Sequence, residues 1–454
     1  MANRAGVVCA FACATGLWLG LQATVALRAQ QVARVIQVAE LPDVGLGEFY
    51  NGLFRFPIDH IVDDHGVRFG SIGSDIFHDP VDSYNEFWAV TDRGPNGNPG
   101  RRTFLAPAFS PVILQFRVDD DRIKILSARP IVDASDRPVT GLSNLPGFDE
   151  IPYDFAGTNV IDGNPNGLDT EGLVRTQAGR FWMVEEYSPS LILVDQNGRV
   201  AERYVPEGSA LATTLATTPN YLVKKYLPPI LNFRRQNRGF EGIAMTSDER
   251  TLFLAMQSPL DYPTSALGRA SRNVRIFRFD TLSERITGEF VYRFDEVCAF
   301  LAQSADCGVA PGEMKISGLI ALSPTSLLVE ERTDTAAKIY RVDLSGATNI
   351  LGTVWDAVAP SPNASTPALE SLADPSSQGV VVMPKSLVVN LSTLPGVPNK
   401  IEGIALVRPD VLAVANDNDF GLVDNATFTA GGRLSNDTLV RSKLLYVHLA
   451  SPVN

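Results

Sequence analysis

Histidine and cysteine are both scarce in this chain of 454 residues, which contains four of each. His60, His65 and His78 lie near one another in sequence, but their spacing is not that of zinc ligands. We interpret these histidines as structural or surface residues. The sequence also lacks Gly-x-Ser-x-Gly, His-Glu-x-x-His, Walker and Rossmann motifs, which removes the usual signatures of serine esterases, zinc peptidases and nucleotide-binding proteins. A Ser-His-Asp triad has no motif to support it.

Positive charge is in deficit along the whole chain. Lysine and arginine total 39 residues against 51 aspartates and glutamates, so the formal net charge is −12 and the pI is near 4.9. Proteins that bind nucleic acids usually carry a basic patch, and none is visible here. We therefore expect no nucleic-acid partner, whereas the acidic balance is compatible with the binding of cations.

Apolar runs long enough to cross a bilayer are missing after the first 29 residues. Residues 1–29 have the pattern of a signal peptide, with Arg4, an apolar stretch from Ala5 to Leu27, and small residues near its end. Cleavage is expected after Ala26 or Ala29. An uncleaved anchor is the alternative, because the stretch is long for a signal. We expect residues 30–454 to form a single domain that is secreted or periplasmic and leaves the membrane once the signal is removed.

Cysteine usage agrees with export. Cys9 and Cys13 fall inside the expected signal, which leaves Cys298 and Cys307 in a loop-like stretch. Two cysteines this close in an exported chain predict a disulfide bond, and no other cysteine remains to build a metal site. Four Asn-x-Ser/Thr sequons would be glycosylated only in a eukaryotic secretory pathway. They begin at Asn363, Asn390, Asn425 and Asn436.

A repeated pattern organises the rest of the chain. From Asn237 to Leu260, a Glu-Gly pair leads into two short apolar runs separated by a polar turn, which predicts a β-hairpin. The same pattern recurs, with two weaker copies that lack the glutamate. The Glu-Gly copies start at Glu171, Glu241 and Glu402, and the weaker ones at Ser317 and Ile72.

Each repeat is followed by further strand-like runs, giving about four strands per repeat. Repeated groups of four antiparallel strands predict an all-β fold, a β-propeller, of which five repeats are detectable. A large β-sandwich with accidental similarity is the alternative. The lone strand at 31–41 is expected to complete the last blade beside the strand at 442–450, which removes a free edge. Insertions at 131–166, 206–236 and 356–384 are expected near a binding face, and 210–225 has a helical pattern.

Acidic residues recur at the strand ends, which converge on the axis of a propeller. Crowded carboxylates repel one another unless a cation joins them, and oxygen-only ligands favour Ca²⁺, with Mg²⁺ second. The candidate metal ligands are Glu171, Glu241, Glu402 and Asp417. The candidate catalytic residues are Glu186, Asp92 and Arg93. Arg93 and Arg332 each follow an acid directly and could instead neutralise carboxylates or bind an anion. The alternative is that the acids only cap turns within each blade.

Several of these stretches resemble the phytase-like family. They are TDRGPNG at 91–97, DTEGLV with GRFWMVEEYSP at 169–189, NRGFEGIA with LFLAMQSPL at 237–260, KISGLIAL with LLVEERTD at 315–334, and KIEGIAL with LAVANDNDF at 400–420. The resemblance implies a propeller related to the calcium-dependent phytases, and hence six blades. The sequence departs from that family in showing no Lys/Arg cluster that matches the phosphate-binding set.

Three functions are consistent with this pattern. The first is an exported Ca²⁺-dependent phosphoesterase that acts on a small molecule at an acid-lined central channel. The second is a Ca²⁺-dependent lactonase or carboxylesterase that uses the same channel on a carbonyl group. The third is a non-catalytic binding module in which an ion is only structural.

Overall fold

The computed structural model describes Met1 and residues 32–54, 60–97, 101–215, 220–422, 427–435 and 440–453. The expected signal peptide with its cleavage sites and cysteines lies outside the described residues, as do the sequons at Asn425 and Asn436. The described residues from Val32 onward belong to one compact unit. Among them, no helix combines the length and the apolar character that a membrane crossing requires.

Antiparallel strands dominate this unit and group into five blades of four strands, one blade carrying an extra strand. Blade 1 contains β2 (Asp75–Phe77), β3 (Glu86–Val90), β6 (Val112–Asp119) and β7 (Arg122–Pro130). Blade 2 contains β9 (Thr170–Arg175), β10 (Phe181–Glu185), β11 (Ser190–Val194), β12 (Val200–Pro206) and the extra β13 (Leu222–Leu227).

The other three blades repeat the order of four strands. Blade 3 contains β14 (Phe240–Met245), β15 (Thr251–Met256), β16 (Asn273–Asp280) and β17 (Arg285–Arg293). Blade 4 contains β18 (Lys315–Ser323), β19 (Ser326–Arg332), β20 (Ala337–Asp343) and β21 (Lys385–Asn390). Blade 5 contains β22 (Ile401–Arg408), β23 (Val411–Asn416), β24 (Lys443–His448) and β1 (Arg34–Glu40).

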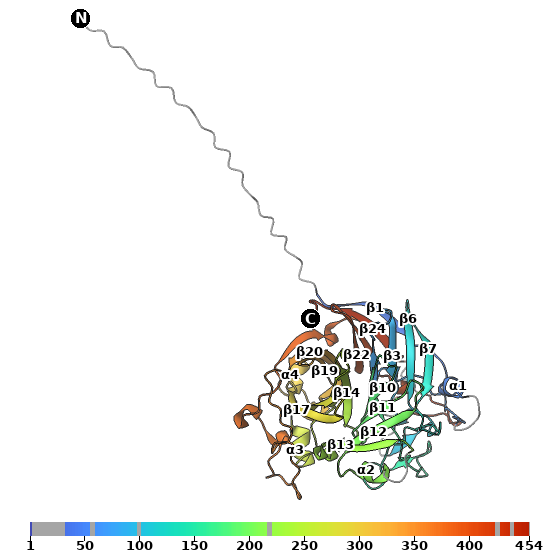
Figure 1. The fold of residues 1–454 in the computed structure, drawn as a ribbon. Coiled ribbons are helices and arrows are strands. Elements are labelled where there is room, and N and C mark those ends of the chain that lie inside the picture. The colour runs from blue at the N-terminus through green and yellow to red at the C-terminus, as the bar shows by residue number, and fades with distance from the viewer. Residues whose placement is uncertain are drawn as a thin grey trace. The chain divides into compact units, whose positions relative to one another are not determined.

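The first strands of the five blades close a ring around a central axis. β9 contacts β14, β14 contacts β18, β18 contacts β22, β22 contacts β2, and β2 contacts β9 again. Figure 1 shows the blades arranged in this order, from blue through green and yellow to red. The β-propeller prediction is therefore confirmed. The implied count of six is not confirmed: in the described part of the chain the ring closes with five blades, and the segments between blades carry short helices and loops.

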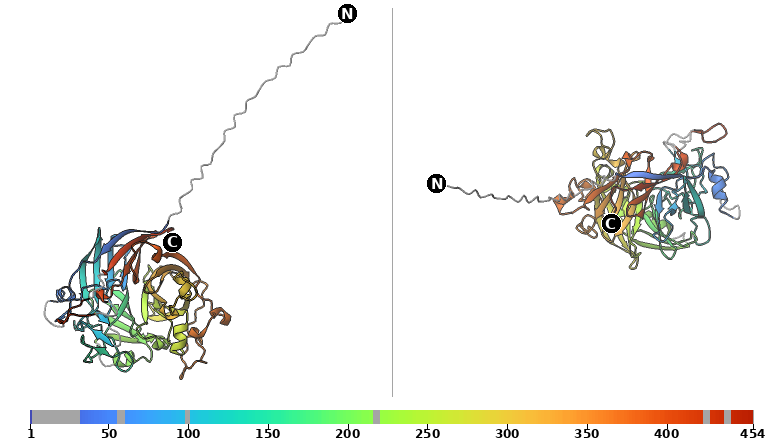
Figure 2. Two further views of the ribbon diagram at one scale, coloured as in Figure 1. Left: turned by 180° about the vertical axis from the view of Figure 1, so that it is seen from behind. Right: turned by 90° about the horizontal axis from the view of Figure 1, so that it is seen from above.

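Strand β1 closes the ring as expected, by completing blade 5. It pairs antiparallel with β24 from Arg34↔His448 to Glu40↔Lys443. It also meets β7 of blade 1 in parallel at Glu40↔Arg122, which joins the two blades into one eight-stranded sheet. The blue β1 lies beside the red β24 in Figure 1 and in both views of Figure 2. A strand from the start of the chain thus covers the edge that β24 would otherwise expose.

The glycine of the Glu-Gly pair is required where neighbouring blades touch. A Cβ atom on Gly242 would lie 2.3 Å from the carbonyl oxygen of Ser317 in blade 4, and one on Gly172 would lie 2.9 Å from that of Glu241 in blade 3. A Cβ atom on Gly318 would lie 3.0 Å from the carbonyl oxygen of Glu402 in blade 5. Only glycine permits so close an approach of backbone, so the repeated glycines bring the first strands together at the axis.

Small elements outside the blades occupy the connections. Strands β4 (Asn96–Gly97), β5 (Arg102–Phe104) and β8 (Pro152–Tyr153) form a separate three-stranded sheet. The helices are α1 (Leu46–Asn51), α2 (Ala210–Leu215), α3 (Ser265–Ala270) and α4 (Val297–Phe300). Short 3₁₀ helices are η1 (Pro229–Phe233), η2 (Pro311–Glu313), η3 (Leu369–Ser371), η4 (Pro375–Gln378), η5 (Leu391–Thr393) and η6 (Asp419–Gly421).

Two local expectations have different outcomes. The predicted disulfide is confirmed: Cys298 and Cys307 are bonded in the connection between blades 3 and 4. The helix predicted at 210–225 is wrong in its second half. Among the described residues of this range, only α2 is helical, and β13 then pairs in parallel with β12. The edge of blade 2 offers backbone partners that outweigh the helical pattern of the side chains.

The closure by β1 yields a prediction about stability. A chain that starts at Leu41 should lose several kcal/mol of unfolding free energy, because β24 loses its backbone partners on one side. It should also associate through the exposed edge of β24. Thermal melting and light scattering measure both effects. A chain that starts at Val32 is the control and should behave like the wild type. Equal melting temperatures for the two chains would contradict the role given to β1.

Candidate functional site

Backbone pairing defines two equivalent positions in every blade. The reference pairs between the first and second strands are Ile76↔Ala89, Leu173↔Met183, Ile243↔Leu254, Leu319↔Val329 and Ile404↔Val414. We define the strand-start position as the residue two places before the first-strand member of each pair. The strand-end position is the residue three places after the second-strand member. The strand-start residues of blades 1 to 5 are Ser74, Glu171, Glu241, Ser317 and Glu402. The strand-end residues are Asp92, Glu186, Gln257, Arg332 and Asp417.

This pairing corrects the weaker repeat that starts at Ser317. The acids Glu330-Glu331 match Glu185-Glu186 by residue type, but the pair Leu319↔Val329 puts Arg332, one residue further on, at the strand-end position. A shift of one residue turns a side chain to the other face of a strand. Glu331 accordingly points away, where it accepts hydrogen bonds from Tyr292 and Lys385. The correction matters because it puts a cation, not an acid, at the axis in blade 4.

The strand ends open into one cavity of about 1490 Å³. Ten carboxylate side chains and seven cationic side chains line it, so acids are in excess. The acids are Asp92, Glu150, Asp169, Glu171, Glu186, Glu241, Asp334, Glu402, Asp417 and Asp419. The cations are Arg93, Arg101, Arg102, Arg238, Lys315, Arg332 and Lys400. All seven residues predicted as catalytic or metal-binding therefore face one site.

Arg332 neutralises the acids on the blade 4 side. Its Nη2 atom contacts Glu402 and lies 3.4 Å from Oε1 of Glu241. Its Nε donates to the Ser317 hydroxyl over 2.7 Å, and that hydroxyl donates in turn to Glu241 over 3.0 Å. Burial raises the pKa of Glu402 to about 8, although Arg332 and Lys400 partly offset the rise. The guanidinium group is thus fixed between two acids from the flanking blades.

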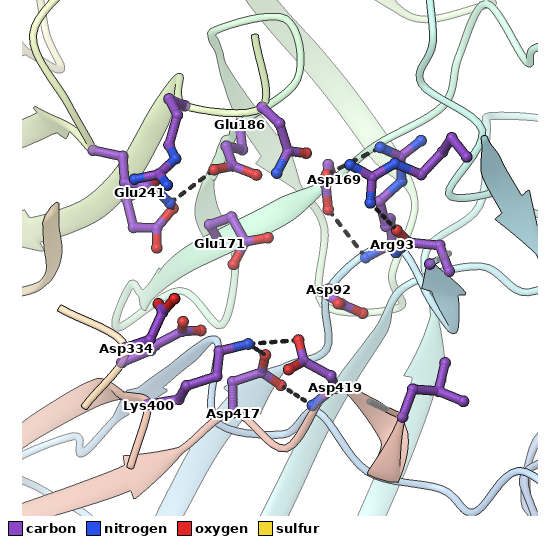
Figure 3. A pocket seen from close by; sticks show the side chains of 18 of the residues that line it. Asp92, Arg93, Asp169, Glu171, Glu186, Glu241, Asp334, Lys400, Asp417 and Asp419 are labelled. Atoms are coloured by element: carbon purple, nitrogen blue, oxygen red, sulfur yellow. Dashed lines mark hydrogen bonds and ion pairs between the residues drawn. The ribbon is translucent and has the colours of Figure 1, made fainter. Parts of the chain in front are cut away.

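Lys400 neutralises the acids of blade 5. Its Nζ lies 3.1 Å from Asp417 and 2.5 Å from Asp419. Asp417 also accepts a hydrogen bond from the Ser71 hydroxyl. Burial would raise the pKa of Asp417, but Lys400 and these hydrogen bonds outweigh it and hold the pKa below its ordinary value. Figure 3 shows Asp417 turned toward Lys400. The structure does not bring Asp417 into a group with the other three predicted ligands.

Arg93 forms an ion pair with Asp169, a residue that the sequence analysis did not select as a candidate. It donates from its backbone N–H (3.2 Å) and from Nη1 (3.4 Å) to the two oxygens of that carboxylate. The guanidinium lies over the rings of Phe104 and Tyr187, 4.8 and 4.1 Å from their centroids. Only 3% of its surface is exposed. Arg93 is therefore placed to orient Asp169 within the cavity wall.

Glu171, Glu186 and Asp92 have no ion-pair partner among the described residues. Asp92 accepts the backbone N–H of Gly94, and Glu186 accepts the amide of Gln257 over 2.8 Å. Burial and the neighbouring acids Glu241, Asp169 and Glu186 raise the pKa of Glu171 well above its ordinary value. Burial and nearby acids raise the pKa values of Asp92 and Glu186 in the same way. In Figure 3, Glu171 lies centrally among these carboxylates.

Two carboxylate groups share Glu171 and could each hold a cation. One is Asp169–Glu171–Glu186 and the other is Glu171–Glu241–Glu402; within each, one oxygen per residue lies within 4.8 Å of the others. The predicted meeting of Glu171, Glu241 and Glu402 at the starts of three first strands is thus confirmed, while their role as ligands stays a prediction. Sequence reasoning missed Asp169, although it lies two residues before Glu171 in the DTEG motif.

Two cations that are distant in sequence meet in the cavity. Arg238 and Lys315 line the cavity beside Glu186, and both lower its pKa against the effect of burial. Lys315 lies 2.5 Å from Asp334, whereas Arg238 has no ion pair with a described residue and donates to the Ser258 hydroxyl at 3.4 Å. These cations come from different blades, so no run of basic residues marks them in the sequence.

Comparisons with known proteins found one relative in sequence and several solved structures with low similarity. An uncharacterized secreted protein of Arthroderma benhamiae is 26% identical over 286 residues, which are 53% of this chain and 56% of the relative. The match therefore spans little more than half of that protein. A luciferin-regenerating enzyme has 10% identity and a TM-score of 0.34, with 87% of this chain and 96% of that chain covered. An aldose sugar dehydrogenase from Streptomyces coelicolor has 9% identity and a TM-score of 0.32, with 86% and 97% covered.

A family model covers most of the chain. Its description is "Phytase-like: Esterase-like activity of phytase", and it matches residues 67–420. The matched range begins just before β2 of blade 1 and ends at Phe420, directly after β23 of blade 5. It includes both axial positions of all five blades. On this evidence the chain belongs to the phytase-like family.

Proposed function

We propose that this protein is an exported hydrolase that cleaves phosphate esters of small molecules with the help of a bound Ca²⁺ ion. The observation that carries the proposal is a set of acids without an ion-pair partner among the described residues, the half-buried Asp92 and the buried Glu171 and Glu186, beside the cations Arg238 and Lys315. Such a site attracts a divalent cation to its acids and an anion to its arginine and lysine. A phosphate ester complements that combination better than a neutral lactone does.

The donor set fits Ca²⁺. The carboxylates around Glu171 offer only oxygen atoms, come from separate strands and loops, and are buried. Hard cations prefer oxygen ligands, and Ca²⁺ tolerates irregular geometry better than Mg²⁺ does. Glu171 would bind the ion together with Asp169 and Glu186, or together with Glu241 and Glu402. When bound, the ion would polarise the phosphoryl oxygens and lower the pKa of an attacking water.

The chain's own residues would bind the substrate and move protons. Arg238 and Lys315 would bind the phosphoryl oxygens, because their charges face the cavity next to Glu186. Glu186 or Asp92 would accept a proton from water at its carboxylate oxygen. Arg93 would keep Asp169 in place, since its guanidinium is enclosed by Phe104, Tyr187 and Asn144.

Two separate observations support export. The matched relative is described as secreted, and the Cys298–Cys307 disulfide is typical of an oxidising compartment. A hydrolase of extracellular or periplasmic esters would need no nucleotide cofactor. It would also meet Ca²⁺ outside the cytosol.

The first experiment measures phosphate release from a panel of phosphomonoesters, with and without a chelator. Glu186→Gln should lower kcat by about 100-fold, because it removes the proposed proton acceptor but keeps the size of the side chain. Glu48→Gln is the control, since Glu48 is exposed on α1 far along the chain from the cavity residues. Calcium-dependent cleavage of aryl esters or lactones, without phosphate release, would support the carboxylesterase instead. An absence of both activities would leave a binding module.

The raised pKa values give a second, pH-dependent prediction. Glu402 and Glu330 have pKa values raised to about 8, mainly by burial, above the ordinary value of 4.5. Without metal, the folded state holds more protons than the unfolded state between these values. Stability should therefore be highest near the acid end of this range and should fall as pH rises from about 4.5 to 8.

Ca²⁺ should reverse this loss, because it replaces the protons among the ionised acids. A hundredfold excess over Kd adds about 2.7 kcal/mol to the unfolding free energy. We expect Ca²⁺ to raise the melting temperature of chelator-treated protein more at pH 8 than at pH 5, and more than Mg²⁺ does. Glu171→Gln should lose most of this gain, whereas Glu48→Gln should keep it. If chelator, Ca²⁺ and Mg²⁺ all leave the melting temperature unchanged, the proposed metal site is refuted, and the proposed Ca²⁺-dependent hydrolase with it.

A further inference from the structure

The strand-end position differs in charge from blade to blade. It carries a carboxylate in blades 1, 2 and 5, the amide of Gln257 in blade 3, and the guanidinium of Arg332 in blade 4. Arg332 is therefore the place where the repeated architecture supplies a positive charge of its own. The strand-start residues on either side of it, in blades 3 and 5, are Glu241 and Glu402.

The guanidinium of Arg332 is held in the space between these two acids. It is 1% exposed and contacts Glu402, Glu241, Asp334 and the Ser317 hydroxyl. Two of the three members of the Glu171–Glu241–Glu402 group thus already share a fixed positive charge. A divalent cation placed there would lie close to a buried guanidinium, and like charges at that distance repel strongly.

In the other carboxylate group, a fixed cation contacts one member, Asp169, instead of two. Among the described residues, Glu186 accepts a hydrogen bond from the amide of Gln257, and neither Glu186 nor Glu171 has an ion-pair partner. Arg93 approaches Asp169 at 3.4 Å, but its guanidinium is enclosed in the wall by Phe104 and Tyr187. A second observation points to a ligand in the channel, next to Gln257, whose side-chain amide donates to both Glu186 and Glu241. Oε1 of Gln257, a residue 5% exposed that lines the cavity, has no hydrogen-bond partner among described residues.

We propose that the channel holds one divalent cation, in the Asp169–Glu171–Glu186 group, and that Arg332 takes the place of a second cation in the Glu171–Glu241–Glu402 group. This inference rests on the metal of the proposed function, but not on the reaction. It makes Arg332 a residue that limits the number of ions bound, and it assigns the ion to the side of the channel formed by blade 2.

The test is a calorimetric titration of chelator-treated mature protein with Ca²⁺. We expect one ion per chain for the wild type. Arg332→Gln should bind two, because Glu241 and Glu402 lose their fixed cation, and Arg332→Lys should restore the value of one. Arg238→Gln is the matched control: it removes one arginine charge from the same cavity without touching Glu241 or Glu402, and it should bind one. Two ions in the wild type, or one ion in Arg332→Gln, would overturn the proposal.

Two further variants keep the test decisive if Arg332→Gln does not fold. With Arg332 intact, Glu186→Gln should weaken Ca²⁺ binding by about 100-fold, whereas Glu402→Gln should leave the stoichiometry at one and change the affinity far less. The opposite order would place the ion in the other group and refute the assignment, as would an absence of Ca²⁺ binding to the wild type. Because the readout is stoichiometry, a protein that binds one ion but releases no phosphate would retain this inference and lose the proposed function.

Discussion

Repulsion between like charges at the axis of the ring is the constraint on which the rest of the site depends. A closed ring of repeated blades places equivalent residues opposite one another, so a glutamate that recurs in the sequence meets its own copies in space. Glu171, Glu241 and Glu402 do so within 4.8 Å. At such distances buried carboxylates cannot all stay charged unless protons or cations join them. Two pairings in this cavity meet that requirement: Lys400 neutralises Asp417, and Arg332 neutralises Glu402. Around Glu171 the requirement is met by protonation, because burial and neighbouring acids raise its pKa well above the ordinary value.

Much of the fold could be predicted from sequence, because the same strand pattern recurs in every repeat. The glycine after each glutamate marks the closest approach of two blades, as Gly242 and Ser317 demonstrate, and the alternation of short apolar runs marks the strands. The closing role of β1 followed from a strand without a partner. The number of blades was harder to predict. The resemblance implied six, whereas the contacts between first strands close a ring of five in the described chain.

The site was predicted in part, and its two failures have different causes. Residues that repeat at the strand starts were found, since their spacing is regular. The acids Glu330 and Glu331 match Glu185 and Glu186 by residue type, so the alignment favoured Glu331, whereas the strand pairing puts Arg332 at the strand end. Lys315 and Arg238 were missed for another reason. They belong to different blades, and only the closure of the ring gathers them into one cavity.

The position of Arg332 between two blades has a consequence for how this channel can change over evolutionary time. Arg332 contacts Glu241, 91 residues earlier, and Glu402, 70 residues later. A neutral residue in place of the arginine would leave two buried acids uncompensated, and loss of either acid would leave the arginine partly unpaired. Substitutions at these three positions should therefore be accepted together or not at all. In such a ring, a charged residue in one blade cannot be substituted without a matching substitution in the blades beside it. Segments that are distant in the sequence should therefore evolve together.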